Sequence, residues 1–317
     1  MAFLGRGASL GFGIESTWGT AVARTNWMRV VSTGIDRTID KVPRPHLGTL
    51  GATSANRRSH FSASDMVAGD FEIVASYDDS TLLLLEYGLG GVATTGAGPF
   101  VHTFTLTEAL PTGLTIEQIF GTGGAEVYDG CMMTNLGISC AVGEVMRLTG
   151  SVVGRTSGGR VAAGTPTYSS NGASVIHHQA GTFGFNGEVY NLKSMDLTVD
   201  NRLGTRQQLG SLLTSRPNRS DFMEVGVSVT LEYSNENLQT ALYADTQGDA
   251  TITFTQGGGS NNVAAFNFQN AYITSVSTPV SGTDVIELTV DFICESDGTD
   301  EGLSIAITND NASSQAN

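Results

Sequence analysis

Short stretches in which apolar and polar residues alternate recur along most of the chain. They are rich in Val, Ile, Thr and Phe, are bounded by Gly, Asn, Asp or Pro, and cover residues 70–77, 100–107, 113–120, 195–200, 226–233, 250–256, 264–268 and 285–293. A period of two is typical of strands that bury one face, and turn residues at regular spacing favour an antiparallel sandwich or barrel. The pattern therefore predicts a mainly β protein.

Two segments have helical signals instead. Residues 78–81 (DDST) offer N-cap side chains for a helix over 82–89, and Gly90 follows it. Ser234 is placed to cap a second helix over 237–246, with Gly248 just beyond. The apolar residues expected to pack these helices against a sheet are Leu82, Leu85 and Leu89 in the first and Leu238, Leu242 and Tyr243 in the second.

The two predicted helices lie in the same sequence context. Tyr77, Leu82 and Tyr87 match Tyr233, Leu238 and Tyr243 at one constant spacing. Further matches follow in the same order: 47–50 with 209–212, Asn56-Arg57 with Asn218-Arg219, and 145–149 with 285–289. An ordered set of matches with insertions at loops is typical of a duplicated module. The predicted organisation is a Gly-rich arm (1–26), a first module (27–159), a linker (160–172), a second module (173–298) and a C-terminal tail (299–317).

Composition narrows the function. The 317 residues carry 16 Lys+Arg against 31 Asp+Glu, a net charge of −15, which argues against a basic nucleic-acid footprint. Only Lys41 and Lys193 are lysines, so no polybasic membrane patch is expected, and the longest strongly apolar run, 82–85, is too short to span a bilayer. With 15% charged residues and 40 glycines, the chain suits a surface covered by copies of itself. We expect a protein made in a cytoplasm, with three reduced cysteines, Cys131, Cys140 and Cys294.

Candidate chemistry is sparse. His177 and His178 are adjacent, so in a strand they point to opposite faces and cannot easily share a metal. Asp78 and Asp79 are explained by helix capping. The Gly-rich stretches 121–124 and 257–259 lack a following Gly-Lys-Ser/Thr and are expected to be hairpin turns. The sequence thus predicts no catalytic residue, no cofactor and no metal site, and a protein that is not an enzyme.

Three segments resemble the major tail tube protein of long-tailed, siphovirus-like bacteriophages, in a form with a duplicated module. They are GASLGFGIESTWGTAV (7–22), YDGCMMTNLGISCAVGEVMRLTGSVVGR (128–155) and LTVDNRLGTRQQLGS (197–211). The resemblance implies two tandem modules, each a β-sandwich or partial barrel with one short flanking helix. It also implies self-assembly in the host bacterial cytoplasm into stacked rings of the virion tail, through which DNA passes without specific binding. Tape-measure, tail terminator and distal tail proteins are the implied partners.

Some doubled members of that family are thought to close a ring with three chains in place of six, and we expect the same pseudo-sixfold ring here. The long loops 47–60 and 209–221 contain arginines in a chain poor in cations: Arg57, Arg58, Arg216 and Arg219. Because Arg pairs well with carboxylates, these four residues are expected at surfaces between subunits. Alternatives stay open: a tail-tip hub or head decoration protein, a surface adhesin or S-layer repeat, or a carbohydrate-active β-sandwich enzyme.

Overall fold

The computed structural model describes residues 5–43, 60–121, 123–168, 175–178, 181–256, 262–280, 285–298 and 301–312. Strands dominate these residues, which confirms the mainly β prediction. The first half of the chain contains η1 (Gly5–Gly7), β1 (Ser9–Ile14), β2 (Asn26–Thr33), β3 (Asp36–Pro43), β4 (His60–Val74), α1 (Asp79–Leu89), β5 (Gly90–Thr95), β6 (Phe100–Leu106), β7 (Leu114–Ile119), β8 (Ala125–Ala141), β9 (Arg147–Gly154) and β10 (Thr156–Val161).

The second half contains β11 (Gly181–Phe185), β12 (Glu188–Tyr190), β13 (Leu192–Asp200), β14 (Leu203–Arg206), β15 (Ser215–Arg219), β16 (Glu224–Glu232), α2 (Asn237–Tyr243), β17 (Gly248–Thr255), β18 (Val263–Ser277), β19 (Glu287–Cys294) and β20 (Leu303–Asn309). Strand β1 lies in the segment 1–26 that the sequence predicts as an arm, and β20 lies in the predicted tail 299–317.

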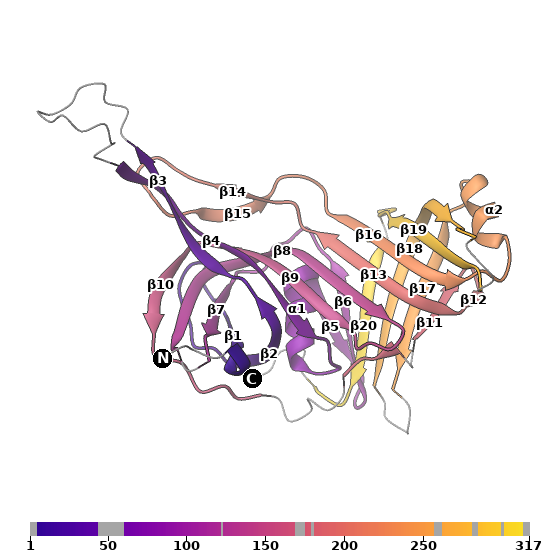
Figure 1. Cartoon of the computed structure of the whole chain (residues 1–317), viewed down its shortest axis with the longest axis horizontal. Helices are drawn as coiled ribbons and strands as arrows, with labels where there is room; N and C mark the ends of the chain where they lie inside the picture. The colour runs from indigo at the N-terminus through magenta and orange to yellow at the C-terminus, as the bar shows by residue number, and fades with distance from the viewer. Residues whose placement is uncertain are drawn as a thin grey trace, which may run out of the picture.

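Strands of the first half close into a barrel (Figure 1). The antiparallel pairings run β1–β2–β4–β9–β8–β7 and return to β1. Closure pairs each strand of the circuit on both sides over part of its length, which reduces the free edge that a strand-rich fold otherwise exposes. Its interior is apolar and includes Phe12 and Phe71, whose rings meet edge to face at 5.8 Å. Tyr128 is fully buried and donates its hydroxyl to the Ile35 carbonyl at 3.0 Å.

The second half follows the same order of pairings. The circuit runs β11–β12, then β13–β16–β19–β18–β17 and back to β11, with only Asn191 between β12 and β13. Phe183, Phe268 and Phe292 fill this barrel, which lies on the other side of Figure 1. In each half a further strand, β10 or β20, pairs with the first part of the long strand β8 or β18.

Irregularities of register also recur at corresponding places. Thr134 is the bulge residue of the β8–β9 pair, and its hydroxyl donates to the Ser151 carbonyl at 3.1 Å. Thr274 is the bulge residue of β18–β19 and donates in the same way to the Asp291 carbonyl at 3.0 Å. Bulges re-aim a strand and are kept as features of a fold, so their recurrence extends the likeness of the halves to the level of hydrogen bonds.

The two helices differ in their surroundings. In α1, Leu82, Leu85 and Leu89 are buried, and the helix contacts β2, β5, β6 and β8. In α2, Leu238 is buried and Leu242 is half-buried. Tyr243 is 85% exposed, so its expected place in the core is wrong. The reason is that α2 is shorter, packs mainly on β18 and has no hairpin comparable to β5–β6 over it; it also begins after Glu236 and not at Ser234.

Candidate assembly interface

The two barrels are joined edge to edge by a continuous ladder. β8 pairs with β13 from Asn135 opposite Asp200 to Ala141 opposite Ser194. One sheet therefore runs from the first barrel into the second without a break (Figure 1). The ladder continues at both ends, where Asn201 N donates to Thr134 O at 2.9 Å and Val142 N donates to Lys193 O at 3.0 Å.

Apolar side chains make this junction part of the core. Leu136 and Ile138 from β8 and Leu197 and Val199 from β13 are all buried. Burying a side chain of this kind stabilises the fold by about 1.5–3 kcal/mol, so the junction has the character of a barrel interior and not of a hinge.

A second ladder joins the halves through β6 and β20, from Thr105 opposite Ser304 to Phe100 opposite Asn309. His102 lies in it, fully buried, with Thr94 Oγ1 2.9 Å from Nδ1 and Asn309 Oδ1 3.1 Å from Nε2. Asn309 Nδ2 also donates to the Tyr77 carbonyl at 2.6 Å. These contacts attach strand β20, which lies near the C-terminal end of the second half, to the first half of the chain.

Two of the arginines predicted at surfaces between subunits, Arg216 and Arg219, bridge the halves of one chain. Arg219 Nη1 donates to the carbonyls of Thr107 at 3.0 Å and Glu108 at 3.1 Å. Arg216 Nη2 donates to the carbonyls of Leu110 at 3.1 Å and Pro111 at 3.0 Å. Burial lowers the pKa of Arg219. Both guanidinium groups therefore bind backbone carbonyls of the segment between β6 and β7, and their place at an interface between subunits stays a prediction.

Arg57 and Arg58, the other two candidates, lie outside the described residues. Their place at an interface between subunits stays a prediction.

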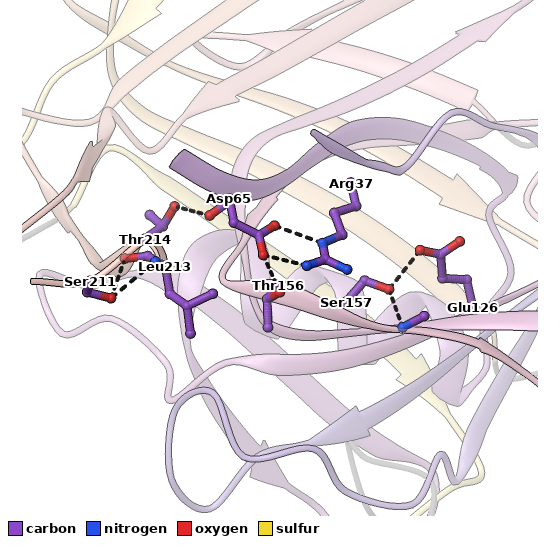
Figure 2. Close-up of polar contacts among 9 residues, drawn as sticks. Arg37, Asp65, Glu126, Thr156, Ser157, Ser211, Leu213 and Thr214 are labelled. Carbon is purple, nitrogen blue, oxygen red and sulfur yellow. Dashed lines mark hydrogen bonds and ion pairs between the residues drawn. The ribbon is translucent and has the colours of Figure 1, made fainter. Parts of the chain in front are cut away.

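A polar cluster around Asp65 on β4 forms a third contact between the halves (Figure 2). Arg37 on β3 donates from Nε and Nη2 to its carboxylate at 2.8 and 2.6 Å, and Thr156 Oγ1 donates at 3.1 Å. The Asp65 backbone N donates to Leu212 O at 2.8 Å, and Thr214 Oγ1 donates to its carbonyl at 3.3 Å. The Arg37 hydrogen bonds hold the pKa of Asp65 below its ordinary value, despite the opposing effect of burial.

Sequence reasoning missed this cluster. Arg37 and Asp65 become neighbours only because β3 and β4 pair in one particular register, and no local pattern marks either residue. Both residues lie outside the strands that the alternation of apolar and polar residues predicted, so the sequence offered no signal for this pair.

Groups suited to chemistry are not gathered in the part of the chain that the structure describes. No cluster of three or more His, Cys, Asp or Glu side chains there could hold a metal ion. Burial raises the pKa of Cys140 to about 11 and that of Cys294 to about 12, and all three cysteines are free. Among the described helices, none has the length and apolar character needed to cross a membrane.

Two barrels joined through strand ladders, with further polar contacts between the halves, define a mainly β protein. The sequence model of the phage tail tube protein family matches residues 5–294, so the chain belongs to that family. It is a structural protein of the phage virion tail, in a family that is typically non-enzymatic. A search of curated proteins finds no match to the chain.

Proposed function

We propose that this protein self-assembles into rings that stack into the tail tube, the conduit for DNA delivery into the host. The observation that carries the proposal is the β8–β13 ladder, which joins two barrels of the same pairing order edge to edge. A barrel whose sheet extends into a second barrel of the same chain is suited to pair in the same way with a barrel of another chain, because each barrel presents the same kind of strand edge.

The chain is a duplicated module, divided near the segment 160–172, and three chains with two barrels each close a pseudo-sixfold ring. The recurrent bulges at Thr134 and Thr274 and the repeated circuits of pairings support this division. Three chains are favoured because six would double the number of barrels around the axis and widen the bore.

The charge suits a conduit. A net charge of −15 per chain gives repulsive or weak contact with DNA phosphates, so the duplex passes without specific binding. Assembly takes place in the host bacterial cytoplasm, and the tape-measure, tail terminator and distal tail proteins of the tail are the further partners.

Electron microscopy of the purified protein tests the proposal. Stacked rings with three chains and six barrels around the axis are expected. Six chains around the axis, each with one barrel at the lumen, would contradict the three-chain ring. Isolated rings that never stack would instead favour a tail-tip hub or head decoration protein.

A further inference from the structure

The strand edges left unpaired among the described residues include the counterparts of the two edges that form the β8–β13 junction. On the β17 side of β18, pairing ends at Ala271, so the edge from Ser275 to Ser277 has no strand beside it. On β2, pairing with β1 ends at Arg29. Beyond it, residues 32–38 pair only with β4, and their other edge has no strand beside it.

The correspondence is fixed by the bulges. The bulge at Thr134 precedes Asn135, which enters the junction, and the bulge at Thr274 precedes Ser275. The second edge of each junction is aligned by a shared register irregularity. In the β2–β4 pair it lies between Val30 and Ser32, and in the β13–β16 pair it lies between Leu192 and Ser194. Ser275 thus corresponds to Asn135, and Ser32 to Ser194.

We propose that β18 of one copy pairs antiparallel with the β2–β3 edge of the next copy, in the register of the β8–β13 junction. This inference rests on the proposed ring and names the strands and register that close it. In that register Asp36 lies opposite Ser277, as Thr198 lies opposite Gly137, and Thr38 lies opposite Ser275, as Asp200 lies opposite Asn135.

Backbone geometry of the β2–β3 edge agrees with this pairing. Gly34 N donates to Asp70 O of β4 at 2.8 Å, and residues along a strand alternate in direction. The N–H and C=O groups of Thr33, Ile35 and Arg37 therefore face the open side. The Ile35 carbonyl accepts the Tyr128 hydroxyl and keeps a second lone pair for an incoming N–H.

Side chains at the β18 edge are more exposed than their counterparts inside the chain. Val276 is half-buried, whereas its counterpart Leu136 is fully buried. Val280, just past β18, is 73% exposed, whereas its counterpart Cys140 is 6% exposed. A second copy placed as β13 is placed would cover these valines, which supplies an apolar contribution beside the backbone ladder.

The junction between chains differs from the one within a chain in one respect. Within the chain, the hairpin β5–β6 follows α1, and β6 adds the second ladder to β20. In the second half, α2 ends at Tyr243 and β17 begins at Gly248, with no hairpin between them. The junction between copies therefore lacks the second ladder, and rings are expected to open there first.

Cysteine pairs on the assembled full chain test the register. The variant Asp36→Cys/Ser277→Cys, in a Cys294→Ser background, is expected to form disulfides between chains on mild oxidation, ending in covalent trimers on a non-reducing gel. Both positions are exposed. In the proposed register Asp36 and Ser277 form a non-hydrogen-bonded pair of an antiparallel ladder, the kind in which facing side chains approach most closely. Thr38→Cys/Ser275→Cys should behave in the same way.

The matched control is Asp36→Cys/Ser275→Cys, in which the two positions are diagonal at about 7–8 Å. A disulfide needs Cβ atoms about 3.5–4.5 Å apart, so this variant should form at least tenfold less disulfide. Equal yields for all three variants would overturn the register. Rings visible by microscopy with no disulfide in either facing pair would overturn the pairing and leave the proposed function standing. A wild-type chain that forms no rings would overturn both.

Discussion

Replacing one leucine in each helix separates the environments that the structure gives to α1 and α2. Leu85 lies in α1 and is 1% exposed, whereas Leu242 lies in α2 and is half-buried. Both are changed to Ala, which keeps a strong helix-forming residue at the position, so helix propensity contributes little to the result. The difference in the free energy of unfolding then reports burial.

The magnitude follows from the side chain removed. Leu has three more carbons than Ala, and each buried carbon contributes about 0.8 kcal/mol, or about 2.4 kcal/mol in all. Because α1 is enclosed by β2, β5, β6 and β8, the space left behind cannot collapse fully, and the total loss should reach about 3–5 kcal/mol. Leu242→Ala should lose about 1 kcal/mol, since part of that side chain is already in water.

The assay is urea unfolding of the unassembled chain, followed by far-UV circular dichroism. The midpoint should fall much further for Leu85→Ala than for Leu242→Ala, at unchanged slope. Losses that agree within about 0.5 kcal/mol would refute the reasoning, because they would mean that the two helices are equally covered.

Further outcomes follow from the Asp65 cluster and from one close backbone approach. In Arg37→Met, the Asp65 carboxylate loses its ion-pair partner, so the melting temperature should fall at pH 7 by the equivalent of about 1–3 kcal/mol. Because folding lowers the pKa of Asp65, the extra stability of the wild type over Arg37→Met is fully present above the unfolded-state pKa of about 3.9 and is lost as pH falls through the folded-state pKa. A difference in melting temperature between the two proteins that stays constant from pH 7 to 2 would contradict this. Gly69→Ala should destabilise by more than about 2 kcal/mol in thermal unfolding, since a methyl group there would lie 2.3 Å from the Gly34 carbonyl oxygen at a φ of +154°. Gly143→Ala is its control, with a φ of +87° and nothing within 4 Å, and should lose only about 1–2 kcal/mol; equal losses would argue against the contact at Gly69.

Much of the fold was accessible from the sequence because alternation reports directly on which face of a strand is buried. The mainly β class and the tail tube family are confirmed, and Leu82, Leu85, Leu89 and Leu238 are buried. Tyr243 was wrongly predicted to be buried because its match to Tyr87 indicates an equivalent position in the helix, whereas burial depends on the strands that pack over that position. Duplication itself stays a proposal, supported now by pairing order as well as by sequence.

The candidate interface was less accessible. Arg216 and Arg219 were recognised as unusual cations, but their partners are carbonyls about a hundred residues earlier, which any residue type could supply. Asp65 and Arg37 carried no signal before their strands were paired. A side chain's partner depends on register, and register is decided by the whole sheet.

The sequence by itself determined the β class, the presence of two short helices and the faces of the predicted strands that enter the core, because side-chain polarity repeats with the period of the strand. Tertiary structure alone decided which strand edges meet: β8 with β13, β6 with β20, and β18 and β2–β3 left open. The physical reason is that a strand edge is made of backbone N–H and C=O groups, which are the same for almost every residue. An edge therefore has no sequence signature, and its partner is chosen only when the barrels have closed and brought it within reach.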